Sequence, residues 1–406
     1  MVTELNSATL VQSIDNFIKF VGIGRLKQSA ASLRKGVKLS RGLVHRYHVA
    51  EAASFTWWSA LDEYEWGRRP FSGYRFSDNI IALGKDATKL ETLLPTMPES
   101  VRRKFAGSFG ARAGAPAALF EMTMAHHFHN SGYKLEWCED VGAPMPEFVA
   151  RKQGLELEVE CKQLSIDTGR RVARLDFCQF CDLLYQQLRP LELMGDLHVD
   201  VDERLSNKRQ DQVRMVSDIV KTLKRGKGEG VFDWGNVTMH MLPDDRALID
   251  FARVEAAHLR NKPLQAHFAM MARDRDGSAT APIAVSLTCR KADGVLKCVY
   301  DTLADAARIQ LSGIRPGVIC LFIPGIEDFN DLAQGSGLEA ITRKFFDSEN
   351  RSHVAGVVYS SNELIARSVA GVNFSTQALA YRNLSCRFPE VEAFRFFTDN
   401  PNLPVR

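Results

Sequence analysis

The sequence contains no apolar run long enough to cross a membrane, and its N-terminus lacks the pattern of a secretory signal. It also lacks a strong charge bias, because the formal net charge at pH 7 is only +3 over 406 residues. A balance this close to neutral neither demands nor forbids a nucleic-acid partner, since binding then depends on local basic patches. We therefore expect no membrane partner, and the function must be inferred from local sequence motifs.

Two short motifs lack the companions that a metal or nucleotide site needs. Cys178 and Cys181 have the spacing of a zinc-binding pair, but no second pair or CxxH motif accompanies them. Residues 175–185 around them have the pattern of an amphipathic helix instead. The basic loop 224–230 lacks the Gly-Lys-Ser/Thr of a phosphate-binding loop. Its cations could contact a nucleic-acid backbone, or could simply be solvated.

The eight cysteines lie mostly in apolar strand-like or helix-like segments, as Cys161, Cys289, Cys298 and Cys320 do. Such positions favour reduced, buried thiols and a cytoplasmic location. The hydrophobic content of 45% is ample for ordinary cores, and 406 residues exceed one typical domain. We expect two or three domains.

The most informative segment is the alternating run Leu155-Glu-Leu-Glu-Val-Glu-Cys-Lys162. Side chains of a strand point to opposite faces with period two, so the apolar residues share one face while Glu160 and Lys162 share the other. A half-exposed strand with solvated charges is the simpler interpretation of this segment alone. A carboxylate and an ammonium two residues apart can also hold a divalent metal beside a reacting phosphate.

A hairpin is predicted immediately before this strand, because Gln153-Gly154 is a two-residue turn signal. Its register, continued outward, places Glu147 opposite Glu160 on one face, with Lys162 beside them. Two carboxylates at cross-strand distance repel each other unless a cation lies between them, so the hairpin predicts a metal here. The expected pairs are Lys152 with Leu155, Arg151 with Glu156, Ala150 with Leu157, and Phe148 with Val159.

A third acid comes from the segment before, where a helix is predicted over 115–130. Pro116 near its start and Gly132 just past its end are typical helix punctuation. Glu121 borders the apolar stripe of this helix, where its carboxylate can reach the edge of an adjacent sheet. Taken alone, Glu121 is an ordinary helix charge.

The ordered set resembles the PD-(D/E)XK nuclease superfamily. The matching stretch covers about residues 115–170, with a second half near 300–325. The resemblance implies an α/β restriction-endonuclease-like fold, a mixed sheet flanked by helices, whose core runs helix, three antiparallel strands, helix, strand. The residues that carry it are Phe120-Glu121, Gly132-Tyr133, Pro146-Glu147-Phe148 and Glu160-Cys161-Lys162.

The resemblance also implies a role for each residue of the site. Glu147 and Glu160 would ligate a divalent cation, together with the backbone carbonyl of Cys161, and Glu121 would support the metal. Lys162 would orient the attacking water, which the metal activates, and stabilise charge on the phosphate. Hard oxygen ligands suit Mg²⁺ or Mn²⁺ rather than zinc. Glu147 stands where the family usually has Asp, so its carboxylate lies one methylene further out.

Four regions are expected along the chain: a helical N-terminal region 1–110, a first part of the nuclease core 111–175, an α+β insertion 176–298, and a second core part with a C-terminal extension 299–406. In the last region a helix with a capped start at Asp301 leads to Gln310, which the resemblance places near the metal. The predicted strands are 195–201, 237–242, 283–289, 318–323 and 353–359, and the predicted helices include 210–223 and 338–346.

The function implied is a magnesium-dependent endodeoxyribonuclease. The added regions are similar in style to those of nucleases in bacterial defence or mobile-element systems, and double-strand cutting from one site per chain favours a homodimer or a partner protein. An alternative from a different class is a degenerate nuclease fold that binds nucleic acid or a protein without cutting.

Overall fold

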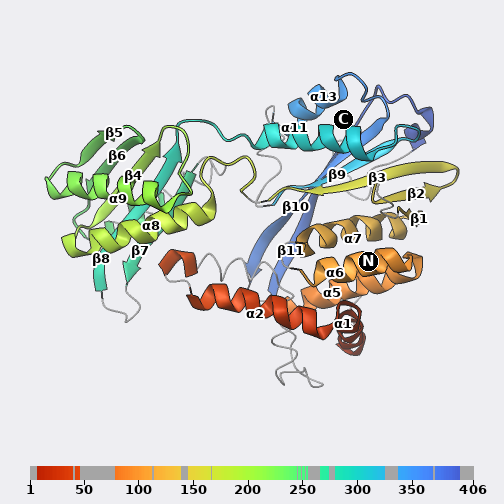
Figure 1. The fold of residues 1–406 in the computed structure, drawn as a ribbon, viewed down its shortest axis with the longest axis horizontal. Helices are drawn as coiled ribbons and strands as arrows, with labels where there is room; N and C mark the ends of the chain where they lie inside the picture. The colour runs from red at the N-terminus through yellow and green to blue at the C-terminus, as the bar shows by residue number, and fades with distance from the viewer. Residues whose placement is uncertain are drawn as a thin grey trace. The chain divides into compact units, whose positions relative to one another are not determined.

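The chain divides into two compact units, each with its own hydrophobic core (Figure 1). Unit 1 consists of Met1–Arg34, Ala52–Ile166 and Leu296–Arg406, and unit 2 of Lys35–Glu51 and Asp167–Val295. The computed structural model describes residues 7–39, 42–45, 78–111, 114–138, 145–165, 167–244, 246–247, 249–251, 253–254, 266–273, 279–324, 337–368 and 371–393.

Unit 1 is built on a six-stranded mixed sheet of order β1-β2-β3-β9-β10-β11. In the first three strands β2 runs antiparallel to both β1 and β3, β9 runs parallel to both β3 and β10, and β11 returns antiparallel to β10. The strands are β1 (Lys134–Trp137), β2 (Phe148–Lys152), β3 (Leu155–Gln163), β9 (Gly317–Phe322), β10 (Val354–Ser368) and β11 (Gly371–Arg382).

The predicted hairpin is confirmed, with the expected register from Phe148–Val159 to Lys152–Leu155. Both turn residues have positive φ, +50° at Gln153 and +84° at Gly154. Two successive residues in the left-handed region form the turn whose twist suits a tight hairpin, and Gly154 adopts that conformation without a steric penalty.

Helices cover both faces of this sheet (Figure 1). One face packs against α7 (Ala115–Asn130), which has α5 (Asp78–Leu93), α6 (Glu99–Phe109) and α1 (Ser7–Val21) beyond it. The expected N-terminal helices therefore share the hydrophobic core of the sheet. The helix α2 (Ile23–Leu39) follows α1, and the aromatic side chains at 57, 58, 64, 66, 71 and 74 lie outside the described residues.

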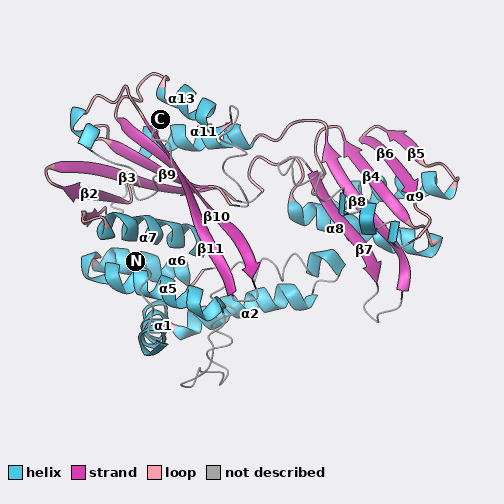
Figure 2. Cartoon of the chain, turned by 180° about the vertical axis from the view of Figure 1, so that it is seen from behind, coloured by secondary structure: helices cyan, strands magenta, loops and turns pink. Residues whose placement is uncertain are grey.

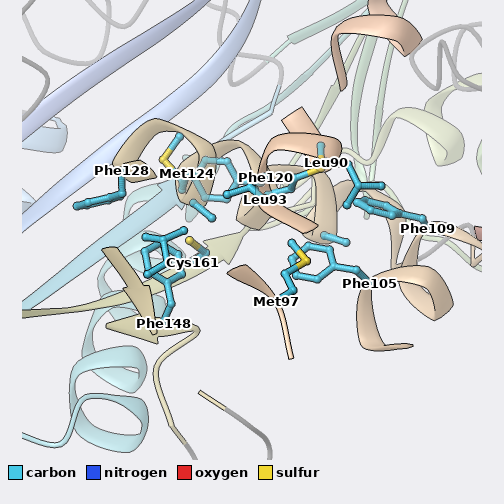
Figure 3. Packing of buried hydrophobic residues seen from close by; sticks show 14 of the residues in the cluster. Leu90, Leu93, Met97, Phe105, Phe109, Phe120, Met124, Phe128, Phe148 and Cys161 are labelled. Atoms are coloured by element: carbon cyan, nitrogen blue, oxygen red, sulfur yellow. The ribbon is translucent and has the colours of Figure 1, made fainter. Parts of the chain in front are cut away.

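The core between α7 and the sheet is rich in aromatic rings. Phe148 of β2 is completely buried and lies 5.7 Å from the ring of Phe128 and 5.6 Å from that of Trp137. Figure 3 shows Phe128 and Met124 on the α7 side, facing Phe148 and Cys161 on the strands. This packing fixes the hairpin, and with it the backbone of the candidate site, against the helical layer.

The opposite face of the sheet packs against α11 (Val295–Asp305) and α13 (Leu338–Phe346) (Figure 1). The prediction that a helix starts at Asp301 is wrong, because the helix begins at Val295 and continues through a single π-helical turn, Ala306–Gln310. Val295, Val299 and Leu303 form one buried stripe that extends it N-terminally. Asp301 sits inside the helix, where it pairs with Lys297.

Strand β9 is buried along almost its whole length, as its continuous apolar sequence predicted. It lies between β3 and β10, both parallel to it, so no edge of β9 is exposed. The predicted helix at 338–346 and the start of the predicted strand near 353 are confirmed by α13 and β10.

Unit 2 contains a five-stranded mixed sheet of order β5-β6-β4-β8-β7 with two long helices (Figure 2). Its two predicted helices, 175–185 and 210–223, and its three predicted strands are all confirmed. The pair Cys178–Cys181 lies on α8, and the fully buried Cys181 belongs to the core. The elements are α8 (Arg174–Leu188), β4 (Gly195–Val201), α9 (Arg209–Lys224), β5 (Glu229–Phe232), β6 (Gly235–Met241), β7 (Ala266–Arg273) and β8 (Ala279–Cys289).

The two ends of the long unit 2 segment lie side by side. The amide of Gly294 donates to the carbonyl of Gly169 at 2.7 Å, and the amide of Arg171 donates to Asp293 Oδ1, also at 2.7 Å. Gly169 has φ +74°, and an added Cβ there would lie 2.7 Å from the backbone nitrogen of Val295. Only glycine fits this contact without moving the backbone.

The chain is therefore a mixed α/β protein with two mixed sheets flanked by helices. The eight cysteines are all free thiols, four of them buried. Among the residues that the structure describes, no helix has both the length and the apolar character required to span a bilayer.

Candidate functional site

The candidate site lies on β3, just past the point where β2 stops pairing with it. Glu160 has no exposed surface, and its Oε1 atom lies 2.6 Å from the Nζ atom of Lys162, whose side chain is 29% exposed. The alternation of the strand places both residues on the face opposite Cys161, which packs in the core under α7. The strand thus presents a buried carboxylate beside a partly accessible ammonium.

Burial raises the pKa of Glu160 to about 7; the Lys162 ammonium opposes the rise and the Glu147 carboxylate adds to it. Apart from the ion pair with Lys162, neither oxygen of Glu160 has a hydrogen-bond partner among the described residues. Buried carboxylates normally have such partners. An orphaned, desolvated carboxylate of this kind fits a cation ligand, which would satisfy the second oxygen.

The backbone groups of Cys161 also face the region where pairing with β2 has ended. The amides of Glu158 and Leu164 donate toward the β9 side, to Pro316 and Phe322. Backbone groups alternate sides along a strand, so the amide and carbonyl of Cys161 point to the β2 side, where regular pairing has ended at Phe148. The carbonyl oxygen implied as a ligand therefore lies beyond the end of the β2–β3 ladder.

Glu147 does not continue the regular ladder. Its amide donates to the carbonyl of Val159 at 3.0 Å, and its own carbonyl accepts from the amide of Cys138 at 3.1 Å. The regular β2–β3 pairing ends at Phe148, one residue short of the expected pair of Glu147 with Glu160. The two carboxylates still interact, because the charge of Glu147 raises the pKa of Glu160.

A lysine absent from the sequence prediction joins Glu147 to Glu121. The Nζ atom of Lys104, on α6, lies 2.6 Å from Glu147 Oε2 and 3.4 Å from Glu121 Oε1. Burial lowers the pKa of Lys104, but the two carboxylates outweigh this effect and leave it above its ordinary value. Burial and the charge of Glu147 hold the pKa of Glu121 well above its usual range.

The predicted residues therefore form two groups. Glu121 and Glu147 meet at Lys104, whereas Glu160 pairs with Lys162 on the face of β3 that points away from α7. Glu147 interacts electrostatically with both groups. In the part of the chain that the structure describes, no group of three or more His, Cys, Asp or Glu side chains is arranged to hold a metal ion.

Gln310 is the last residue of the helical segment that leads into β9. Strand β9 runs parallel to β3 and starts opposite Glu158, so the connecting helix ends near Glu158. The residues after Gln310 confirm this placement, because the amide of Ser312 donates to Glu158 Oε2 at 2.8 Å. Lys162 pairs with Leu321, toward the other end of β9. Within the described residues, no hydrogen bond or ion pair connects Gln310 to Glu147 or Glu160.

Glu158 shares the polar face of β3 but has a structural environment. It is 1% exposed and accepts hydrogen bonds from the amide and the hydroxyl of Ser312. Its Oε1 atom also lies 3.7 Å from Nη1 of Arg315. Its oxygens are thus already satisfied, unlike those of Glu160. The contrast separates two glutamates that look equivalent in the sequence.

Lys104 is the residue that sequence reasoning missed. It follows Arg102 and Arg103, and nothing in this basic triplet distinguishes one cation from the others. Arg102 turns back to the carbonyls of Leu94 and Met97, so only the packing of α6 on α7 selects Lys104.

Comparison with models of known protein families gives no match for this chain, and no curated protein matches it. The case for a function therefore rests on the geometry of the chain itself.

Proposed function

We propose that this chain is a metal-dependent nuclease of the PD-(D/E)XK type, which hydrolyses phosphodiester bonds in DNA. The observation that carries the proposal is the buried, orphaned carboxylate of Glu160, with the Lys162 ammonium 2.6 Å away. Among the described residues this buried acid is paired with one partly accessible lysine. Such a pair is weak evidence for a role in folding, and perturbed groups of this kind cluster at functional sites.

The order of elements supports a restriction-endonuclease-like core. The chain runs α7, β1, β2, β3, α11, β9, with the first three strands antiparallel and β9 parallel to β3. This is the order helix, three antiparallel strands, helix, strand that the sequence resemblance implies. The larger segment of unit 2, Asp167–Val295, follows β3 and ends where α11 begins, so it is an insertion into this core.

The residues present fit a hard divalent cation. Glu160 offers an orphaned oxygen, the Cys161 carbonyl lies beyond the end of the β2–β3 ladder, and Glu147, just before β2, interacts electrostatically with Glu160. These are oxygen donors, which suit Mg²⁺ or Mn²⁺. When bound, the ion would polarise a phosphate oxygen and lower the pKa of a coordinated water.

The chain's own residues would then position the reactants. Lys162 can donate hydrogen bonds to a phosphate oxygen or to the attacking water while its charge offsets that of the phosphate. Glu160 orients this ammonium through their ion pair, because Glu160 is fixed on the same rigid strand two residues before Lys162. Glu121 would act through Glu147 and Lys104, which it contacts electrostatically, as a positioning residue.

Supercoiled plasmid incubated with Mg²⁺ tests the proposal. We expect wild-type protein to nick or cut the DNA, and Lys162→Ala to reduce the rate about a hundredfold or more. Lys152→Ala is the control, because Lys152 is on the same hairpin but donates to the carbonyl of Ser131 near the turn. Cleavage that survives Lys162→Ala would remove Lys162 from the site.

A second candidate is a degenerate nuclease fold that binds nucleic acid or a protein without cutting. One observation favours it: Lys104 already compensates the charges of Glu121 and Glu147, which a metal would otherwise do. The plasmid assay separates the two functions. Retarded migration of DNA without cleavage, in both Mg²⁺ and Mn²⁺, would select the binding module.

The proposed nuclease also has an expected oligomeric state and an expected cellular location. A homodimer, or a partner protein, would bring two such sites to the two DNA strands, and the cytoplasm would supply the magnesium. A role in bacterial defence or a mobile element is proposed only from the kind of regions added to the core, namely the helical N-terminal region and the insertion.

A further inference from the structure

We propose that Lys104 is the resident cation of the candidate metal site, and that a divalent metal competes with its ammonium for Glu147 in order to bind. Lys104 would therefore set the metal affinity of the site. This inference rests on the proposed function, since it assumes that Glu147 is a metal ligand.

The contacts of Lys104 support this role. Its Nζ atom lies 2.6 Å from Glu147 Oε2 and 3.4 Å from Glu121 Oε1, so one ammonium bridges two carboxylates from different elements. A divalent ion would be expected in the same place, since Mg²⁺ lies about 2.0–2.1 Å from its ligand oxygens. While the ammonium is in place it offsets the charge of Glu147 and repels an incoming divalent ion, so the two cations compete for this carboxylate.

Lys104 is also free to leave. Its side chain is 50% exposed, and α6 is anchored without it by the buried residues Val101, Phe105 and Phe109. A long lysine side chain can extend its ammonium into water, and the two ion pairs that it gives up are the interactions that a metal must replace. The helix therefore supplies a rigid base, and the ammonium can exchange between the carboxylates and water.

The contacts of Lys104 with Glu147 and Glu121 stabilise the site when no metal is bound. Glu121 is buried and interacts with Glu147, and two such carboxylates repel each other without a cation. Lys104 supplies that cation when metal is scarce. The same contact then competes with the metal, so Lys104 keeps the acids in place and weakens the metal affinity.

Binding of Mn²⁺, followed by the electron paramagnetic resonance signal of the free ion, tests the inference without any cleavage assay. The variants are Lys104→Met, which keeps the alkyl chain, and Lys104→Gln, which keeps a polar tip if the first variant folds poorly. We expect Mn²⁺ to bind about five- to tenfold more tightly to either variant than to wild type, as removal of a competing ion pair predicts.

Arg103→Met is the control for general electrostatics. It removes a neighbouring exposed cation from the same helix, and Arg103 makes no ion pair within the described residues. We expect its Mn²⁺ affinity to stay within about twofold of wild type, because an exposed charge without contact to the ligands is largely screened. An equal gain in Arg103→Met and Lys104→Met would overturn the specific competition.

The double variant Lys104→Met/Glu147→Gln locates the effect. If Lys104 competes through Glu147, the gain in affinity disappears once Glu147 has lost its charge. Unchanged or weaker Mn²⁺ binding in both Lys104 variants would overturn the inference but leave the nuclease proposal standing. No Mn²⁺ binding by wild type or by any variant would overturn both.

Discussion

The ammonium of Lys162 lies 2.6 Å from Oε1 of Glu160, a carboxylate with no exposed surface. The charge of Glu160 is therefore compensated inside the protein, while Lys162 keeps part of its own side chain in water. Because burial holds the pKa of Glu160 near 7, the strength of this pair changes with pH in the neutral range.

The first prediction concerns Lys162→Met. At pH 8 Glu160 is ionised, so the loss of its partner should lower the free energy of unfolding by about 2 kcal/mol. At pH 5 Glu160 is largely protonated and the loss should be small. Urea denaturation at both pH values measures the difference. Equal losses at pH 5 and pH 8 would show that the pair is not the cause.

The second prediction concerns the pH dependence of stability and Glu160→Gln. The folded-state pKa is raised from 4.5 to about 7, so the native state binds more protons than the unfolded state between these values. Stability should therefore fall as the pH rises through this window. Glu160→Gln should remove that slope and be more stable than wild type at pH 8, by about 1–3 kcal/mol. Urea titrations from pH 5 to pH 8 check this, and an unchanged slope would contradict it.

The third prediction separates Glu158 from Glu160. Ser312→Ala removes the hydroxyl that hydrogen-bonds to the buried Glu158 carboxylate. We expect a loss of about 1.5–3 kcal/mol in the free energy of unfolding, as for a hydrogen bond to a charged group. Mn²⁺ affinity should stay the same, because Glu158 is already satisfied by Ser312 and Arg315. A lower Mn²⁺ affinity in the folded variant would place Glu158 in the site.

The fourth prediction compares two glycines that face each other. Gly169→Ala should destabilise the protein by at least about 1 kcal/mol, because its φ of +74° is strained for alanine and the added Cβ meets the backbone of Val295. Gly294→Ala should be nearly neutral, since its nearest contact is at 3.6 Å. Thermal unfolding of the two variants measures the contrast. Equal melting temperatures would contradict the close approach at Gly169.

The fifth prediction concerns metal removal. If the proposed nuclease is correct, a chelator should stop DNA cleavage, and added Mg²⁺ or Mn²⁺ should restore it, because the ligands are hard oxygen donors. Zn²⁺ should restore little activity at the same concentration. Gel analysis of plasmid after dialysis and readdition measures this. Full activity in the chelator would exclude a metal-dependent mechanism.

Local signals in the sequence predicted the hairpin well. The turn Gln153-Gly154 and the alternation of β3 together fix the register, because a slip of one residue would expose Leu157 and Val159. The helix 115–130 was equally clear from Pro116 and Gly132, and the structure has α7 over the same residues.

What the sequence could not supply depends on long-range packing. Glu160 is buried on a sheet whose next strand, β9, and the helical turn Ala306–Gln310 that contacts β3, come more than a hundred residues later in the chain. Lys104 reaches Glu147 only because α6 packs against α7. The end of the helix at Gln310 is set by where β9 begins, opposite Glu158. None of these relationships leaves a periodic signal near the residues concerned.

The contact between Gly169 and Gly294 has a consequence for how the sheet of unit 1 assembles. Glu158 of β3 pairs with Gly317 of β9 across a long stretch of chain, and closing such a loop costs conformational entropy. Once unit 2 has folded, the bond from Gly294 to Gly169 brings the two ends of that stretch together. With its ends joined in this way the insertion acts as a short connector, so the β3–β9 pairing closes a much shorter effective loop than the sequence separation implies.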